Sequence, residues 1–232
     1  SLHDALPILL GFGTVRKTGN YYRYFVEDFK GVLLLFFLFN GNLVLPHRIT
    51  QLSKWLTDLN TKLASASSVI FGLCGLLVQN VNPIIPTLLD AWISGFTDAE
   101  GTFNVSIIAR AASANGFRVI IRFLLDQKNA SEVLMGIRIL FGFGNVSLRK
   151  ETGAVYRYAN DSLIGLVSVR QYFLAFPLKS KKGESFSKWE SVYSMILEKE
   201  HLTSDGLLRI RTIAKSINLA NSQSTKIGSA RP

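Results

Sequence analysis

The sequence is poor in residues that form cross-links, bind zinc or cross membranes. Its 232 residues include one cysteine and three histidines, which excludes an intramolecular disulfide and argues against a cysteine- or histidine-based metal cluster. The longest apolar runs, residues 31–39 and 69–78, fall well short of the roughly 20 residues that span a bilayer. The N-terminus shows no recognisable targeting peptide. We therefore expect no membrane partner.

Acidic residues are scarce relative to basic ones. Lys and Arg total 26 against 16 Asp and Glu, which gives a net charge of +10. Such an excess favours a polyanionic partner, either nucleic acid or an anionic surface. Hydrophobic residues make up 48% of the chain, enough for a globular protein with a real core. With the short apolar runs, this composition favours a nucleic-acid-binding protein.

One unit of sequence occurs twice. Residues 8–15 reappear as 139–146, so Gly11 corresponds to Gly142 at an offset of 142 − 11 = 131. Residues 22–24 and 53–55 reappear as 156–158 and 187–189, at an offset of 156 − 22 = 134. Repeats of this kind indicate two copies of one structural unit. We expect residues 1–60 to be a truncated first repeat, 61–87 a linker, 88–220 a complete second repeat and 221–232 a disordered tail.

Periodicity in the second copy predicts a helix over residues 88–101, strands over 103–110 and 117–125, and a helix over 130–141. Side chains alternate along the second strand, so we expect Val119, Ile121, Phe123 and Leu125 to face the core. A hairpin over 146–149 and 155–158 follows, and then helices over 162–175, 185–199 and 204–217. The order α-β-β-α-β-β-α is typical of an α+β unit with its helices on one sheet face. The first copy lacks the counterparts of the leading helix and of the first two strands.

Residues 93–101 read Ile-Ser-Gly-Phe-Thr-Asp-Ala-Glu-Gly. Small residues at helical spacing would let another helix approach closely. Asp98 and Glu100 lie at the helix end where the dipole is negative, so a cation would offset the cost of their charge. This string, with Trp92 before it and residues 102–105 after it, resembles the motif of the LAGLIDADG homing endonucleases. The resemblance extends from residue 8 to about residue 218.

The resemblance implies αββαββα repeats whose curved antiparallel sheets form a DNA-binding saddle. It implies that Glu100 is the catalytic acid and that the Ala99 carbonyl is a second ligand for Mg²⁺ or another divalent cation, since hard cations prefer oxygen. Gln127 matches the family's water-orienting residue, and Lys181 matches the catalytic lysine of its basic loop. Auxiliary roles fall to Asp98, His47 and Arg48.

The resemblance also implies a DNA-facing surface on the outer side of the sheet. A concave basic sheet can lie in the major groove of DNA, where side chains reach phosphates and base edges. The candidate contacts on this face are Asn104, Ser106, Ile108, Arg110, Arg118, Arg122, Ser147, Arg149 and Arg157. In the basic loop, Lys179 and Lys182 would contact the DNA backbone.

The function implied by the resemblance is site-specific cleavage of double-stranded DNA for intron mobility, in a mitochondrion or another organelle. The full-length form would be a monomer, and a homodimer is not expected. Cutting both strands in the family requires an acid from each of two helices, and this chain supplies only Glu100. We therefore expect a weakly active or inactive fragment. The alternative is an RNA maturase that binds its host intron RNA and assists splicing without cleavage.

Overall fold

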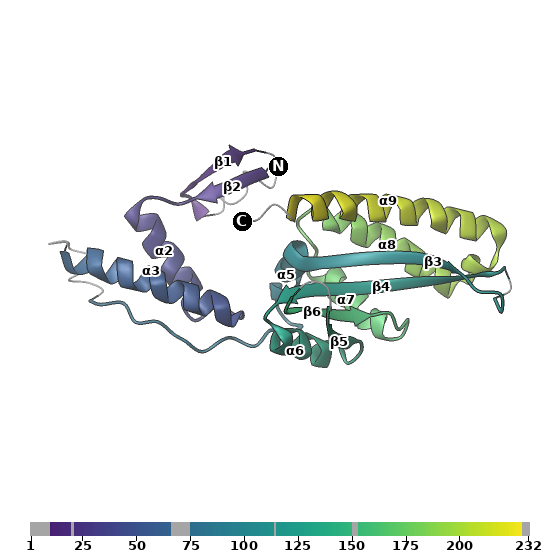
Figure 1. Ribbon diagram of the computed structural model, residues 1–232, viewed down its shortest axis with the longest axis horizontal. Helices are drawn as coiled ribbons and strands as arrows, with labels where there is room; N and C mark the ends of the chain where they lie inside the picture. The colour runs from purple at the N-terminus through teal and green to yellow at the C-terminus, as the bar shows by residue number, and fades with distance from the viewer. Residues whose placement is uncertain (1–9, 20, 66–74, 114, 150–152, 229–232) are drawn as a thin grey trace. The chain divides into compact units, whose positions relative to one another are not determined.

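The computed structural model describes residues 10–19, 21–65, 75–113, 115–149 and 153–228 (Figure 1). The chain divides into two compact units, residues 1–85 and 86–232. Among the described helices, none combines the length and the apolar character needed to cross a bilayer.

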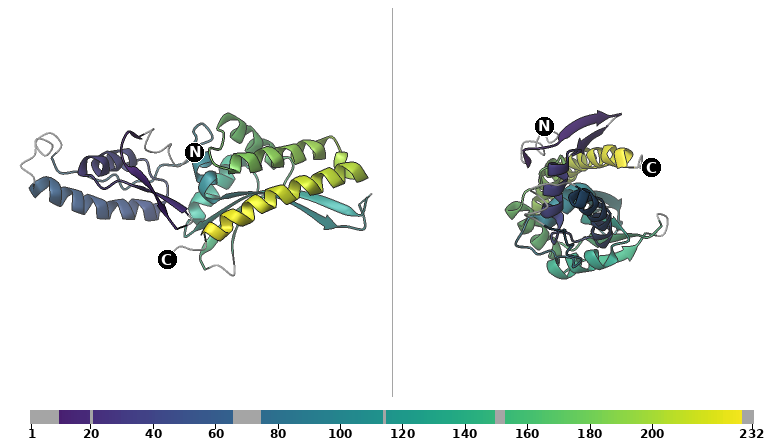
Figure 2. Two further views of the ribbon diagram at one scale, coloured as in Figure 1. Left: turned by 90° about the horizontal axis from the view of Figure 1, so that it is seen from above. Right: turned by 90° about the vertical axis from the view of Figure 1, so that its left-hand side faces the viewer.

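The second unit has the order α-β-β-α-β-β-α that the sequence predicts, followed by further helices. Its elements are α5 (Trp92–Glu100), β3 (Gly101–Ala109), β4 (Phe117–Lys128), α6 (Ser131–Phe141), β5 (Asn145–Leu148), β6 (Val155–Asn160), α7 (Gly165–Ala175), α8 (Lys182–Leu197), the 3-10 helix η1 (Glu200–Leu202) and α9 (Ser204–Gly228). The strands form one antiparallel sheet in the order β3-β4-β6-β5. Helices α6, α7 and α8 pack on the sheet, and α8 and α9 run side by side along it (Figure 2).

Aromatic side chains form the core between this sheet and its helices. Phe103 on β3 lies 5.4 Å from the ring of Phe123 on β4, 5.4 Å from that of Phe173 on α7 and 5.5 Å from that of Trp189 on α8. All four side chains are buried, and such rings supply large apolar area as well as favourable edge and stacking contacts. The predicted alternation along β4 is confirmed, because Ile121, Phe123 and Leu125 are buried on this inner face. The described helices of this unit leave the outer face of the sheet open (Figure 1).

The first unit contains the hairpin of β1 (Thr14–Thr18) and β2 (Tyr21–Phe25), followed by α2 (Phe29–Phe39) and α3 (Pro46–Ser65). Its core joins Leu33 and Phe36 of α2 to Leu52 and Leu59 of α3. Part of the predicted linker also belongs to this unit. Residues 61–65 are helical, Leu77 is buried in the same core, and residues 66–74 lie outside the described residues.

The sequence repeat is also a structural repeat. The Tyr24 hydroxyl donates to the Phe12 carbonyl at 2.5 Å, and its counterpart Tyr158 donates to the Phe143 carbonyl at 3.0 Å. In each copy, a glycine at positive φ, Gly13 or Gly144, lies between the accepting carbonyl and the strand that follows it. A β-carbon at either glycine would collide with the tyrosine ring. The hairpin and two helices of the first unit therefore correspond to β5, β6, α7 and α8.

Several predicted boundaries were wrong. The helix expected from residue 88 begins at Trp92, because the Asp90 side chain accepts the Trp92 amide at 2.8 Å and holds the preceding residues in a turn. Helix α8 begins at Lys182 rather than Ser185, which brings a lysine into its first turn. The predicted disordered tail is helical as far as Gly228, since residues 218–227 contain neither glycine nor proline, and residues 229–232 lie outside the described part of the chain.

Gly101 ends α5 and begins β3 without an intervening loop, at an ordinary φ of −82°. A β-carbon there would lie 2.4 Å from Thr97 Cγ2 and 2.8 Å from the Thr97 carbonyl oxygen. We expect Gly101→Ala to lower the free energy of unfolding by about 1–3 kcal/mol, because the packed neighbours must move. Urea unfolding measures the difference.

Gly95→Ala is the matched control, since a β-carbon at Gly95 in the same helix meets nothing within 4 Å. It should stabilise the protein by roughly 0.5–1 kcal/mol through helix propensity. Equal unfolding free energies for the two variants would contradict the close-approach argument.

Candidate functional site

The strand register brings two predicted catalytic residues to one end of the sheet. Gly101, the first residue of β3, pairs with Leu125, so β4 continues past the start of β3 through Lys128. Gln127 lies in that extension and Glu100 lies at the end of α5, which contacts both strands. Both side chains are half-buried. A carboxylate and an amide are therefore available where the helix meets the sheet.

Asp98 fastens the predicted basic loop to this end of α5. Its carboxylate accepts the Lys179 amide at 2.8 Å, the Ser180 amide at 3.1 Å and the Ser180 hydroxyl at 2.6 Å. Hydrogen bonds to a charged acceptor are the stronger kind. Lys179 and Lys181 are exposed, and Lys181 directly precedes α8. Asp98 thus positions the loop, and its auxiliary role in catalysis stays a prediction.

For Lys182 the sequence predicts only a contact with the DNA backbone, but in the structure its amine also reaches α5. Its Nζ donates to the Thr97 carbonyl at 3.1 Å and to the Ala99 carbonyl at 3.2 Å. Burial lowers the pKa of Lys182, and the nearby carboxylates of Glu100 and Asp98 act against that shift. The lysine is the cation that offsets the negative helix end. It shares the Ala99 carbonyl that the family resemblance assigns to the metal.

Helix α5 is fixed to α7 by a buried hydroxyl. Tyr172 Oη donates to the Asp90 carbonyl at 2.8 Å and accepts the Ser94 amide at 3.1 Å, while the Ser94 hydroxyl donates to the Phe176 carbonyl. Burial raises the pKa of Tyr172, so the hydroxyl keeps its proton at neutral pH. Of the small residues on α5, Ser94 is buried and Gly95 is exposed. The small-residue face is therefore only partly used within this unit.

The predicted DNA-facing residues share the outer face of the sheet. The register pairs Asn104 with Arg122 and Ile108 with Arg118 across β3 and β4. Arg122 Nη1 donates to Asn104 Oδ1 at 3.2 Å and to the Ser106 hydroxyl at 3.1 Å. The remaining predicted members of this face are Arg110, Ser147, Arg149 and Arg157.

Asp126 is an outer-face residue that the sequence reasoning missed. It accepts two hydrogen bonds from Arg157, at 2.6 Å from Nε and 2.6 Å from Nη2, and one from Arg149 Nη1 at 2.9 Å. The hydrogen bond to Asp126 raises the pKa of Arg157. The predicted strand ended at Leu125, three residues before the end of β4 at Lys128. Continuing the alternation from Arg118 and Arg122 would have placed Asp126 on this face.

The remaining auxiliary residues lie in the first unit. His47 and Arg48 occupy the first turn of α3, and Arg48 Nη1 donates to Gln51 Oε1 at 2.9 Å. Burial lowers the pKa of His47, and the neighbouring Arg48 charge lowers it further. Their role as counterparts of Lys181 and Lys182 stays a prediction. Within the described residues, no three His, Cys, Asp or Glu side chains are grouped as a metal cluster.

Comparison with known proteins gives consistent matches. Residues 93–193 match the family described as LAGLIDADG endonuclease. The chain is 31% identical over 213 residues to the Neurospora crassa "Probable intron-encoded endonuclease 4", covering 90% of this chain. It is 29% identical over 204 residues to the Schizosaccharomyces pombe "Uncharacterized cox1 intron-2 37.2 kDa protein", covering 87%. The chain spans 36% and 58% of the lengths of these two curated relatives.

Solved structures support the same fold. The homing endonuclease I-TnaI is 34% identical, with a TM-score of 0.52 over 55% of this chain and 86% of that chain. The meganuclease I-SmaMI bound to uncleaveable DNA is 19% identical, with a TM-score of 0.71 over 92% of this chain and 80% of that chain. The predicted α+β fold class, with antiparallel sheets built from repeats of this type, is confirmed.

The Asp98 contacts predict the behaviour of the basic loop. Asp98→Ala removes the acceptor of two loop amides, so we expect faster hydrogen exchange at Lys179 and Ser180 and a loss of about 1–3 kcal/mol in unfolding free energy. Asp161→Ala, which removes an exposed acid beyond β6, should leave both measurements unchanged. Unaltered exchange at Lys179 and Ser180 in the Asp98 variant would show that the loop is held by other contacts.

Proposed function

The chain belongs to the LAGLIDADG homing endonuclease family, and from this premise we propose that it serves site-specific hydrolysis of duplex DNA. The observation that carries the proposal is the convergence of Glu100, Gln127 and the Asp98-bound basic loop at one end of a sheet whose outer face is rich in arginine. Its similarity to an intron-encoded endonuclease and to a DNA-bound meganuclease supports DNA cleavage over the RNA maturase alternative.

The donor set at the end of α5 fits a hard divalent cation. Glu100 supplies a carboxylate and Ala99 supplies a carbonyl, and Mg²⁺ accepts one or two protein oxygens together with water and substrate phosphate oxygens. The amine of Lys182 at the Ala99 carbonyl supports the view that this end of the helix attracts cations. When bound, the metal would polarise the phosphate and lower the pKa of a water molecule.

The chain's own residues supply positioning and charge. We assign Gln127 to orient water at the scissile phosphate, and Lys181 to contact that phosphate from the exposed start of α8. Lys182 holds the last carbonyls of α5 in place. Asp98 fixes Ser180 in the loop directly before Lys181 and Lys182. Arg118 and Arg122 on the outer face bind the duplex, in a manner that weakens with salt.

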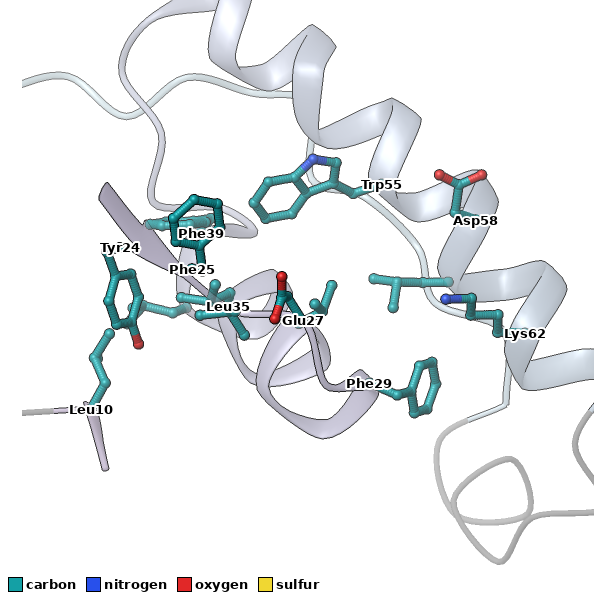
Figure 3. A pocket seen from close by; sticks show the side chains of 14 residues that line it. Leu10, Tyr24, Phe25, Glu27, Phe29, Leu35, Phe39, Trp55, Asp58 and Lys62 are labelled. Carbon is teal, nitrogen blue, oxygen red and sulfur yellow. The ribbon is translucent and has the colours of Figure 1, made fainter. Parts of the chain in front are cut away.

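The first unit contains an apolar cleft that bears on the domain organisation. The cleft, of about 740 Å³, lies between β2, α2 and α3 and is lined by Tyr24, Leu35, Phe39 and Trp55 among others (Figure 3). Trp55 is 41% exposed there. A patch of large apolar side chains of this kind marks a surface that another element covers.

Counterparts in the second unit indicate which element that is. At the offset of 134, Tyr24, Phe39 and Trp55 become Tyr158, Phe173 and Trp189, and these pack on Phe103 of β3 and Phe123 of β4. Trp189 is fully buried as a result. We propose that residues 1–60 are part of a first repeat whose cleft takes an equivalent β-hairpin, within a longer monomeric protein that acts in the mitochondrion. The cox1 and ND4 introns of its relatives support that compartment.

A fusion tests the cleft directly. A second copy of residues 86–131 placed before Ser1 continues the repeat in register, because Ser1 corresponds to Glu132 at the offset of 131. The Trp55 signal of fluorotryptophan-labelled protein is assigned by its absence in Trp55→Phe. In the fusion, this signal should lose its solvent-isotope shift, because Trp55 is then covered. Replacing both copied phenylalanines, those of Phe103 and Phe123, by serine should restore it, whereas replacing the copied Ile108 should not. An accessible Trp55 in the intact fusion contradicts the proposal.

The fusion also tests catalysis, since it carries a second Glu100-type acid. The probe is a supercoiled plasmid pool with randomised inserts in Mg²⁺ buffer. Residues 1–232 alone should give no linear product, and the fusion should give some. Glu100→Gln should reduce cleavage by roughly three orders of magnitude, because the amide loses the charge that holds the metal, a contribution of several kcal/mol. DNA binding should persist in gel-shift assays. Full cleavage by the Glu100→Gln fusion would show that the metal site is elsewhere.

A further inference from the structure

We infer that Asp126 is a specificity-determining positioning residue, which holds Arg149 and Arg157 as one rigid pair that reads G·C base pairs. The inference rests on the proposed function, because it takes the outer sheet face as the DNA surface. The inference gives a role to an acidic residue that lies on the face where a polyanion would bind. That role is selection of the DNA sequence rather than a contribution to binding affinity.

The carboxylate lies at the meeting point of three adjacent strands. Asp126 on β4 is directly opposite Arg157 on β6, and Arg149 follows β5 with its amide bonded to the Val155 carbonyl at 2.8 Å. The side chains of Asp126, Arg157 and Arg149 are 26%, 32% and 41% exposed. They are therefore accessible to a ligand on the outer face while their positions are fixed by one another and by the strands.

The hydrogen bonds set the orientation of each guanidinium. Arg157 uses Nε and Nη2 in a two-point contact with both carboxylate oxygens, and such a fork fixes the plane of the group. Arg149 uses Nη1 on the same carboxylate. The Nη1 of Arg157 does not take part in this two-point contact. Arginine is the usual reader of the guanine O6 and N7 edge, and a carboxylate can accept from cytosine N4.

The size of the expected contribution to folding distinguishes a role in stability from a role in recognition. Partly exposed ion pairs contribute little to the free energy of folding, so stability alone does not explain an acid on a face where it would repel phosphate. Holding two arginines in place before binding removes part of the side-chain entropy lost on association. It also keeps them from turning toward the phosphates, which are the same in every sequence. Arg118 on β4, by contrast, is exposed and is suited to contact a phosphate.

The control for charge is Glu190, a second acid that pairs with an arginine. It accepts Arg170 Nε at 2.8 Å, and its side chain is 25% exposed, close to the value for Asp126. The pair lies on α7 and α8, which cover the inner face. Glu190→Gln therefore removes the same charge and releases an arginine away from the outer face.

The experiment selects bound duplexes from a pool with a randomised core, using the full chain, Asp126→Asn, Asp126→Glu and Glu190→Gln. The full chain should enrich G·C at one or two neighbouring positions by about fivefold to hundredfold over A·T. Asp126→Asn should lose that enrichment, bind random duplex more tightly at low salt, and steepen the salt slope by about 0.9 for each added phosphate contact. Asp126→Glu should recover part of the enrichment, and Glu190→Gln should match the full chain.

A second measurement keeps the arginine geometry testable without DNA. The Arg157 Nε–Hε signal in NMR spectra should be in slow exchange in the full chain and in fast exchange in Asp126→Asn. A fast-exchanging signal in the full chain would overturn the inference. So would binding of Asp126→Asn with an unchanged selection profile, while leaving the proposed function intact. Absence of duplex binding by the full chain at low salt would instead overturn the proposed function, and the inference with it.

Discussion

The packing of Phe103 is the contact on which the second unit depends. Its ring touches the neighbouring strand through Phe123 and both covering helices through Phe173 and Trp189. Because β3 leaves α5 without a loop, this single side chain also fixes where the acidic helix ends. Inner-face packing thus decides the position of Glu100 and, by alternation, the outward direction of the arginines on β4. The candidate site and the proposed DNA surface are two consequences of one core.

The first unit shows the same framework without that contact. Its hairpin, its two helices and its tyrosine-to-carbonyl bond repeat those of the second unit, yet the ring corresponding to Trp189 is partly exposed. Its helices find a partial substitute in the extended segment around Leu77, whose amide and carbonyl are both bonded by the Asn60 side chain at 2.8 and 3.0 Å. An amide side chain can replace a strand's hydrogen bonds, but it covers little apolar surface.

Much of this arrangement follows from the sequence. Period-two alternation predicted the buried and outer faces of β4, and the repeat predicted the correspondence of Tyr24 with Tyr158. The pattern could not predict Lys182 at the carbonyls of α5, because that contact joins residues more than 80 positions apart. Nor could it predict the hydrogen bonds by which Asp98 holds the basic loop. Asp126 was missed for a different reason: strand ends depend on pairing with β6, which single-strand periodicity does not contain.

The direct passage from α5 into β3 at Gly101 has a consequence for how such a protein changes its target. A one-residue insertion between Glu100 and β3 would shift every side chain of β3 to the opposite face. On the proposed function, the distance between the cleaved phosphate and the base pairs that β3 contacts is therefore fixed by the backbone. Retargeting must then proceed by exchanging outer-face side chains at constant length. The connection between β3 and β4 lies at the far end of the hairpin, where a change of length leaves the position of Glu100 unaltered.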